Sequence, residues 1–459
     1  MTEAVLQEAL LNDVARKVEA AGIDTILVCL VDMQGRLMGK RFHAQSFLRH
    51  SAHETHCCNY LLATDLEMAT PDGYRATSWA QGYGDYTMHP DLSTFRLVPW
   101  LPGTALVLCD MYDHATHRPV PHSPRQVLQR QVERLAAAGG FEPMMATELE
   151  FFLFEGTVDE NRKRNFAGLT PVGGFSQDYH IFQTTKEEAV MRPLRNHLFA
   201  AGIEVECTKG EAEMGQEELN LRYGPALLCA DQHTIAKHAA KEIAWQQGLS
   251  ATFLPKWRAD KVGSAAHIHC SLFRDGVNLF HDAARPYAKS ELMDHFVAGL
   301  IRYAPDYACF LAPYVNSYKR FRKGTFAPTK TAWSVDNRTA GFRLCGTDTK
   351  GVRIECRIGG SDINPYLAQA ALLAAGLAGI EEKLPLGAPI SGDIYRQTEI
   401  GDIPRTLREA TQSLRQSVML RAAMGDEVVD HYVRAAEVEQ EEFDAVVTDW
   451  EIARGFERC

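Results

Sequence analysis

The chain has 459 residues and carries 48 lysines and arginines against 59 aspartates and glutamates, which gives a formal net charge of −11. Hydrophobic residues make up 46% and charged residues 23%, proportions that exclude intrinsic disorder as the main state. The acidic balance argues against a nucleic acid as partner, because binding to the phosphate backbone needs clustered basic residues. An anionic substrate would need local arginines or metal ions.

The eleven cysteines are scattered and form no CxxC pair. This pattern is typical of reduced thiols and favours neither a disulfide framework nor a structural zinc site. The N-terminus lacks the basic start and apolar block of a signal peptide. The Ala- and Gly-rich stretch at 367–380 is too short to span a bilayer. We therefore expect a cytoplasmic protein without membrane contact.

The first part of the chain predicts strands and a long loop. Residues 24–42 join an apolar run and a mixed run through DMQG, which indicates a β-hairpin. Residues 65–103 are rich in Gly, Pro, Tyr and Trp without clear periodicity, so we expect a long ordered loop that contacts a neighbouring subunit. Residues 105–112 predict a further strand.

A helix is predicted from Ser123, an N-cap residue followed by Pro124, to a stop at Gly139. We place a domain boundary near residue 115. The predicted units are residues 1–115 and residues 116–459, and the last sixty or so residues form an amphipathic helical tail.

Four short segments alternate apolar and polar side chains with a period of two, as half-buried strands do. Their polar faces carry carboxylates, imidazoles and arginines in place of the usual Lys, Thr and Ser. These faces contain Glu148 and Glu150; Glu218, Asn220 and Arg222; His267, His269 and Ser271; and Arg353, Glu355 and Arg357.

A solvated surface would explain any one of these segments, but four of them favour a site. Clustered carboxylates repel one another unless a cation neutralises them. Glu and His without a thiolate suit Mg²⁺ or Mn²⁺. Further arginines occur at 320, 338 and 343, and arginine suits phosphate or carboxylate recognition. Metal-binding acids with many arginines indicate phosphoryl transfer, yet the chain has neither a P-loop nor a convincing GxGxxG.

Over nearly its whole length the chain resembles the glutamine synthetase family. The resemblance rests on the ExE strand at Glu148–Glu150 and on the segments EAEMGQEE, HIHCS, NSYKR, DNRTAGFR and RIECRIGGSDINPY, in family order. It implies an α+β fold, with an N-terminal β-grasp domain and a C-terminal catalytic domain built on a curved antiparallel sheet and helices. It also implies active sites between neighbouring subunits of hexameric rings, with two rings stacked as a dodecamer.

The resemblance also implies a role for each matching residue. Two or more Mg²⁺ (or Mn²⁺) ions would be bound, one by Glu150, Glu211 and Glu218 and a second by Glu148, His267 and Glu355, with Glu213 as an alternative to Glu211. ATP would contact Glu206, Tyr223, His269, Ser271, Lys350 and Arg353. Glutamate would be held by Gly263, Arg320 and Arg357, and the phosphoryl group by Arg338 and Arg343.

The implied reaction has two steps. A carboxylate oxygen of glutamate attacks the γ-phosphate of ATP to give an acyl phosphate. An amine then displaces phosphate to give an amide. An alkylammonium has a pKa near that of lysine, about 10, so it must lose a proton before it attacks.

The sequence departs from the family on the amine side. Family members that use ammonia carry a flap glutamate where this chain has Phe326, within RKGTFAP. The family's DGSS motif is absent, which leaves Asp65 in ATDLEM as a weak candidate for a carboxylate donated by a neighbouring subunit. Before HIH, only Gly263 and Ser264 match the NGSG pattern of glutamate binders.

An aromatic ring in place of a carboxylate makes the amine pocket more apolar. We therefore predict a γ-glutamyl-amine ligase, which joins glutamate to an organic amine. Three alternatives stay open: an authentic glutamine synthetase that uses ammonia, an enzyme with another acid substrate, and an inactive structural or regulatory relative. The sequence does not name the amine.

Overall fold

The structure, a computed structural model, describes residues 3–459, so the first two residues of the predicted N-terminal unit lie outside the described part. Its N-terminal elements are α1 (Glu3–Ala20), β1 (Thr25–Val31), β2 (Leu37–His43), α2 (Ala44–Ser46), η1 (Phe47–Ser51), β3 (Thr55–Cys58), η2 (Asn59–Leu62), η3 (Trp79–Gln81), β4 (Asp85–Leu97) and β5 (Thr104–Asp113).

The larger unit adds helices and strands in alternation. They are α3 (Pro124–Gly139), β6 (Glu142–Glu155), α4 (Val158–Lys163), α5 (Ile181–Thr184), η4 (Thr185–Glu187), α6 (Glu188–Ala200), β7 (Val205–Gly210), β8 (Gln216–Leu221), β9 (Gly224–Pro225), α7 (Ala226–Gln246), β10 (Leu249–Thr252), β11 (Ala266–Arg274), β12 (Val277–Asn278), η5 (Pro286–Ala288), α8 (Glu291–Arg302), α9 (Ala304–Leu311), η6 (Ser317–Arg320), β13 (Trp333–Val335), β14 (Phe342–Cys345), β15 (Arg353–Cys356), α10 (Pro365–Glu381), η7 (Ile394–Arg396), α11 (Leu407–Gln416), α12 (Val418–Met424), α13 (Asp426–Ala445) and α14 (Asp449–Gly455).

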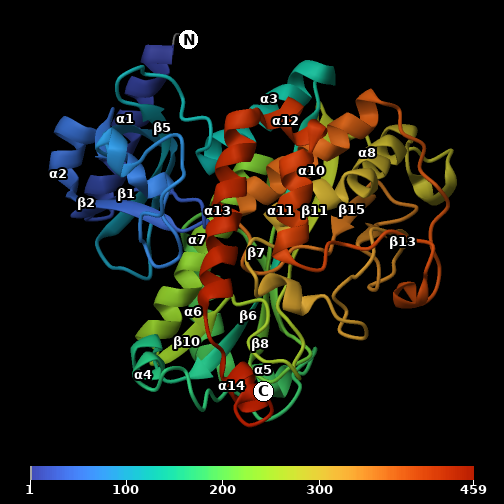
Figure 1. Cartoon of the computed structure of the whole chain (residues 1–459). Helices are drawn as coiled ribbons and strands as arrows, with labels where there is room; N and C mark the ends of the chain where they lie inside the picture. Colours follow the sequence, from blue (N-terminus) through green and yellow to red (C-terminus); the bar gives the residue numbers. More distant parts are fainter. Residues whose placement is uncertain (1–2) are drawn as a thin grey trace.

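The first five strands form one mixed sheet in the order β2-β1-β5-β4-β3, beside the larger unit (Figure 1). The predicted hairpin of residues 24–42 is confirmed, because β1 and β2 pair antiparallel, while β1 and β5 pair parallel. Both faces of β1 are buried: Ile26 and Val28 pack in a core that includes Val14 and Val18 of α1, and Leu27 and Cys29 join the core of the larger unit. The two units therefore share apolar packing, and their boundary near residue 115 stays a prediction.

The prediction of a long loop over residues 65–103 is wrong in its second half. Residues 85–97 form β4, which lies between β3 and β5. Pro90 and a shift of register between Asp91 and Arg96 interrupt the alternation along this strand. That interruption removed the sequence signal of a strand.

The second sheet has the order β13-β14-β15-β11-β6-β8-β7, with β9, β10 and β12 paired to its strands. Its pairs are antiparallel, as predicted, except for the parallel pair β13–β14. Helices α3 and α7 contact β6, and α10 packs against α3, α7 and α8. The long helix α13 lies between the N-terminal unit and the large sheet in the view of Figure 1. No helix among residues 3–459 is long and apolar enough to cross a membrane.

A buried arginine ties the two units together. Arg125 of α3 is 2% exposed. It donates from Nη2 to Asp91 Oδ2 (2.7 Å), from Nη1 to Asp110 Oδ1 (2.6 Å) and from Nε to Asp231 Oδ1 (3.1 Å). The first two carboxylates belong to the N-terminal sheet and the third to α7, so one guanidinium neutralises acids from both units.

This arrangement predicts that Arg125→Met lowers the free energy of unfolding by about 3–5 kcal/mol, because it leaves the buried Asp231 and the half-buried Asp91 and Asp110 without their cation. Urea unfolding followed by circular dichroism measures the change. Arg16→Met is the matched control: Arg16 pairs with Asp13 on the surface at 3.0 Å, and an exposed pair contributes about 0–1 kcal/mol. Equal effects of the two variants would contradict the structural role of Arg125.

Candidate active site

Four adjacent strands, β15, β11, β6 and β8, bring the predicted site residues onto one face of the large sheet. The register places His267 opposite Glu148, Glu218 opposite Glu150, and Glu355 opposite His269. Side chains directly opposite each other on one face lie close together. The polar faces that the period-two pattern predicts for the single segments therefore come together when the strands pair.

Three carboxylates form a first cluster. Glu150, Glu211 and Glu218 each offer an oxygen, and these atoms lie within 4.8 Å of one another. Burial raises the pKa of Glu150 well above its ordinary range, and the charges of Glu211 and Glu218 add to this. Burial and the charge of Glu148 likewise raise the pKa of Glu218 to about 8. Mutual repulsion of this kind is relieved by a bound cation.

Glu211 belongs to this cluster and Glu213, its alternative in the sequence, does not. The carboxylate of Glu213 pairs with Lys261 at 3.2 Å and accepts a hydrogen bond from the backbone N–H of Val262 at 3.1 Å. The geometry therefore favours Glu211 as the third member beside Glu150 and Glu218.

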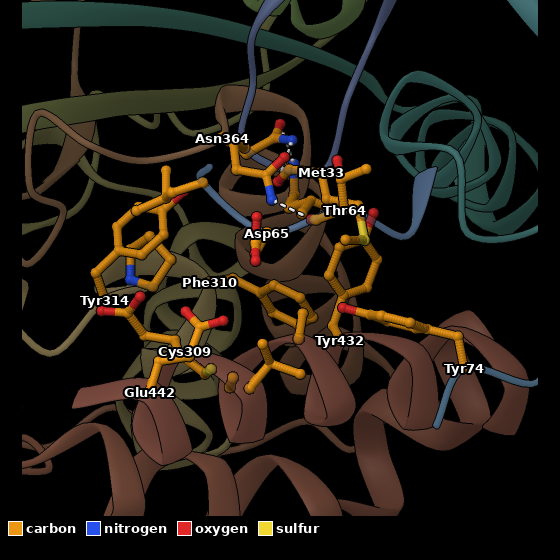
Figure 2. Close-up of a pocket in the computed structure, with 18 residues that line it drawn as sticks. Met33, Thr64, Asp65, Tyr74, Cys309, Phe310, Tyr314, Asn364, Tyr432 and Glu442 are labelled. Carbon is orange, nitrogen blue, oxygen red and sulfur yellow. Dashed lines mark hydrogen bonds between the residues drawn. The ribbon is translucent and has the colours of Figure 1, made fainter. Parts of the chain in front are cut away.

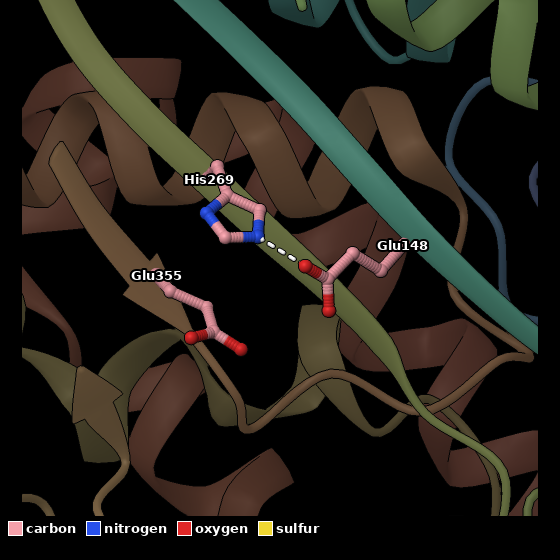
Figure 3. Close-up of side chains that lie close together, drawn as sticks. All are labelled: Glu148, His269 and Glu355. Carbon is pink, nitrogen blue, oxygen red and sulfur yellow. Dashed lines mark hydrogen bonds and ion pairs between the residues drawn. The ribbon is translucent and has the colours of Figure 1, made fainter. Parts of the chain in front are cut away.

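A second cluster surrounds Glu148. Its two oxygens contact His267 Nδ1 at 2.9 Å and His269 Nε2 at 2.8 Å, and His267 Nδ1 lies 3.6 Å from Glu355. Figure 3 shows Glu355 facing the pair formed by Glu148 and His269. His269, predicted as an ATP contact, thus also lies within ligand distance of the acids. Burial lowers the pKa of His267, and the charge of Arg357 acts in the same direction, which favours the neutral imidazole that a metal requires.

The donors of both clusters fit hard divalent cations. They are carboxylate oxygens and imidazole nitrogens, and none of them is a thiolate. Most of them are carboxylate oxygens, the ligands that Mg²⁺ and Mn²⁺ prefer, while structural zinc sites are dominated by cysteine and histidine. Two acid-rich clusters that share one face are consistent with two ions.

Arginines and members of both clusters line one pocket of about 200 Å³. Arg343 donates to Glu355 Oε2 at 3.0 Å, and Arg357 donates to Glu355 Oε1 at 2.5 Å and to the carbonyl of Arg338 at 3.2 Å. The carboxylate of Glu355 is fully buried and accepts from both guanidinium groups. Arg338 also lines the pocket.

Arg320 and Gly263 form the buried part of the same pocket. Arg320 is 2% exposed and donates from Nη2 to three consecutive carbonyls, those of residues 357–359, while its buried Nε has no partner among the described residues. A side chain at Gly263 would meet the carbonyl oxygen of Pro255 at 2.4 Å and Arg320 Cγ at 2.6 Å. Glycine at this position lets the chain approach the arginine closely.

The six predicted ATP residues divide into two groups. His269 and Ser271 lie on β11 and Arg353 on the adjacent β15, where Arg353 Nε lies 3.2 Å from His269 Nδ1. None of these three is among the residues that line the acidic pocket, and neither are the other three. They lie exposed at strand ends or in loops, and they are Glu206, Tyr223 and Lys350.

Asp65 lies apart from both clusters. It lines a separate cavity of about 70 Å³ between the loop after η2 and helices α9, α10 and α13. Figure 2 shows it there with Glu442 of α13. Carboxylate oxygens of Asp65, Glu67 and Glu442 lie within 4.8 Å of one another. Within one chain, Asp65 is not a member of the acidic pocket.

The sequence analysis missed three residues of the pocket wall, Asp178, Tyr179 and Lys209. The first two follow an aperiodic Gly-rich segment, and Lys209 lies on the half-exposed strand β7, so none carried a pattern. Burial alone would lower the pKa of Lys209, but the charge and hydrogen bond of Glu211 raise it above its ordinary value. Lys209 therefore stays protonated between the carboxylates of Asp178 and Glu211.

Comparison with known proteins agrees with this geometry. Residues 121–455 match the family described as glutamine synthetase, catalytic domain. The chain is 45% identical over 444 residues to a gamma-glutamylethanolamide synthetase of Streptomyces coelicolor, covering 96% of this chain and 94% of the relative. It is 35% identical over 441 residues to a glutamate–isopropylamine ligase of a Pseudomonas species, covering 95% and 96%.

A further relative and a solved structure extend the comparison. A glutamine synthetase of Thermus thermophilus is 37% identical over 389 residues, covering 81% of this chain and 84% of the relative. A structure titled as a GmaS/ADP complex superposes with a TM-score of 0.84 at 26% identity, covering 96% of this chain and 99% of that one. The resemblance predicted from the motifs is confirmed, and the chain belongs to the glutamine synthetase family.

Proposed function

We propose that the protein is an ATP-dependent ligase that joins glutamate to an organic amine through a γ-glutamyl phosphate. Two relatives that align over nearly the whole chain support this, the gamma-glutamylethanolamide synthetase and the glutamate–isopropylamine ligase. The names of both describe ligation of an amine to glutamate. Each alignment covers at least 94% of both chains.

The observation that carries the proposal is the side chain of Phe326. It lines the pocket that contains both acid clusters and the arginines, and it is 58% exposed. Its φ of 57° lies in the left-handed region, which bulky residues seldom adopt outside functional sites. Tyr395 fixes the adjacent backbone by donating to the carbonyl of Ala327 at 3.0 Å. An apolar ring is therefore presented to the substrate where the family's ammonia users carry a carboxylate.

In the first step, a γ-carboxylate oxygen of glutamate attacks the γ-phosphorus of ATP, and ADP leaves. Gly263, Arg320 and Arg357 would hold glutamate, with the unpartnered Nε of Arg320 available to a carboxylate. Arg338 and Arg343 would stabilise the charge on the phosphoryl group in transfer. For ATP itself we propose contacts with Glu206, Tyr223, His269, Ser271, Lys350 and Arg353.

Two divalent ions would be held by the two clusters, one by Glu150, Glu211 and Glu218 and the other by Glu148, His267 and Glu355. When bound, they would supply charge neutralisation between an anionic nucleophile and an anionic phosphate. The carboxylates of the chain would hold the ions in place. The arginines would bind the parts of the anionic substrates that the ions do not contact.

In the second step, the neutral amine attacks the acyl carbon, and phosphate leaves with the C–O electron pair. The nitrogen, which carries a positive charge after the attack, passes one proton to the departing phosphate and becomes the neutral amide nitrogen. The ring of Phe326 would contact the carbon skeleton of the amine. Burial of apolar surface contributes about 25 cal/mol per Å², a gain that ammonium cannot make.

We further propose that the chain assembles into hexameric rings stacked as a dodecamer, in the cytoplasm, where its free cysteines would stay reduced. The support is Asp65, which lies outside its own chain's acidic pocket. A ring would allow a neighbouring subunit to present this carboxylate to the amine.

Glu355→Ala is predicted to reduce turnover more than tenfold, a loss of at least about 1.4 kcal/mol of transition-state stabilisation. It removes a proposed ligand and the acceptor of Arg343 and Arg357. ADP release with glutamate and amine measures the rate, and circular dichroism checks the fold. Glu142→Ala, at the exposed start of strand β6, is the control and should retain wild-type activity. A Glu355 variant that keeps more than a tenth of the rate would remove Glu355 from the metal set.

The native mass is predicted to be a multiple of six chains. Size-exclusion chromatography with light scattering gives this mass at assay concentration. A monomer with full activity would contradict a site shared between subunits, because a monomer cannot bring Asp65 to the acidic pocket.

Phe326→Glu is predicted to lower kcat/KM for the best organic amine and to raise the weak activity with ammonium. The first effect follows from lost burial and the desolvation of a carboxylate, and the second from a restored charge partner. Phe326→Leu is the control, since it keeps an apolar side chain and should preserve the preference. Steady-state kinetics with ammonium and a panel of acids and amines would be compared for all three proteins.

The same screen decides between the alternatives. A wild-type enzyme that already prefers ammonium would be an authentic glutamine synthetase. If Phe326→Glu leaves the ratio of kcat/KM for the organic amine to kcat/KM for ammonium unchanged, Phe326 has only a packing role. Absence of ADP release with every acid and amine would favour an inactive relative.

A further inference from the structure

One glutamine side chain lies between the first acid cluster and the segment proposed to hold glutamate. Gln216, the first residue of β8, is 1% exposed. Its Nε2 donates to the carbonyl of Gly263 at 3.1 Å and to Glu150 Oε2 at 3.4 Å. Its Oε1 accepts from the backbone N–H of Glu213 at 3.3 Å. Both polar atoms of the amide thus have partners, and its nitrogen contacts both sites at once.

The backbone of the same residue holds a second member of the cluster. The carbonyl of Gln216 accepts from the N–H of Glu211 at 2.8 Å and from Gln177 Nε2 at 3.0 Å. Gln177 is fully buried, and its Oε1 accepts from the N–H of Gly215 at 3.0 Å. The turn that brings Glu211 toward Glu150 is therefore closed by hydrogen bonds on both sides of Gln216.

The contacts of Glu150 show which of its oxygens a cation could use. Oε2 accepts from the backbone N–H of Ala265 at 2.7 Å as well as from Gln216. Oε1 has no hydrogen-bond donor within residues 3–459, and Glu150 lines the acidic pocket. Two donors on one oxygen fix the orientation of the carboxylate and leave the other oxygen for a cation.

The contact of Gln216 on the glutamate side belongs to an equally constrained segment. Gly263 lies so close to Arg320 and to the carbonyl of Pro255 that a side chain at this position has no room. The N–H of Ser264 donates to the same carbonyl of Pro255 at 2.9 Å. A ligand that binds at Gly263 and Arg320 would therefore order the carbonyl to which Gln216 donates.

We propose that Gln216 is a positioning residue that couples the first cation to glutamate, so that the binding of either one tightens the binding of the other. It would act through the carboxylate of Glu150 and the carbonyl of Gly263. The inference rests on the proposed function for the two assignments that it joins, Glu150 as a cation ligand and Gly263 as part of the glutamate site.

The physical reason is that one amide makes both contacts in a single arrangement. A cation at the cluster orders Glu150, and glutamate at the neighbouring segment orders Gly263. Whichever ligand binds first would order the amide, and the second would then meet a site that is already arranged. Coupling of this kind is reciprocal by thermodynamic necessity, so either ligand can report it.

The test is calorimetric titration of glutamate into the full-length protein, once after removal of divalent metal and once with saturating Mn²⁺. The coupling factor is the Kd without metal divided by the Kd with metal. We expect it to be at least tenfold for wild type. Gln216→Met, which keeps the length of the side chain and removes the amide, should lower the factor at least threefold. The loss is partial because the contact of the Ala265 N–H with Glu150 remains.

Gln131→Met is the matched control and should keep the wild-type coupling factor. Gln131 is also 1% exposed and donates to a carbonyl, that of Ala423, at 3.1 Å, but it does not line the acidic pocket. Steady-state kinetics give a second measurement. In Gln216→Met the KM for glutamate should rise at least fivefold, while the KM for the amine should change less than twofold. Gln216→Leu serves as a second variant if Gln216→Met does not fold.

A wild-type coupling factor near one, or a factor unchanged in the folded Gln216 variants, would overturn the inference while the ligase function stands. Equal rises in the KM values for glutamate and amine would overturn it as well, because they indicate a general disturbance of the pocket. A wild type that shows the coupling but prefers ammonium would remove the organic amine from the proposed function and leave the inference intact. If glutamate does not bind even with Mn²⁺, both fail.

Discussion

The electrostatic balance on one face of the large sheet governs the site. Four adjacent strands place acids and imidazoles there, while their opposite faces, with Leu149, Ile268 and Ile354, pack in the core. Such a face is unstable alone, since burial and repulsion oppose the ionised forms of Glu150 and Glu218. Two arginines offset the negative charge of Glu355. The negative charge of the first cluster, Glu150, Glu211 and Glu218, remains, and hard divalent cations can balance it.

A second balance of buried charges couples the two units. Arg125 neutralises acids from the N-terminal sheet and from α7, and Tyr366 of α10 donates a further hydrogen bond to Asp231 at 2.6 Å. Alternate residues of β1 enter two different cores. The N-terminal unit is thus held in a fixed relation to the large sheet, which a site completed by a neighbouring subunit would require.

Much of the catalytic face could be predicted because half-buried strands leave a period-two record in the sequence. Where the backbone is irregular, the sequence shows no such periodicity, and the positions of side chains could not be predicted from it. Glu211 lies in a turn, so spacing alone did not separate it from Glu213, and the distances to Glu150 and Glu218 did. Strand β4 was missed because its alternation is broken. Asp178 and Tyr179 are placed by the long-range hydrogen bonds of Gln177, which local sequence does not encode.

These limits explain why family membership was easier to recognise than substrate. The groups that neutralise phosphate are charged, numerous and fixed on regular strands, so they define the family. The side chains proposed to meet the amine are few, and Phe326 lies in an irregular flap with a left-handed backbone. An irregular segment can exchange a single side chain without disturbing the sheet. Selection among amines can therefore change while the phosphoryl chemistry of the site stays the same.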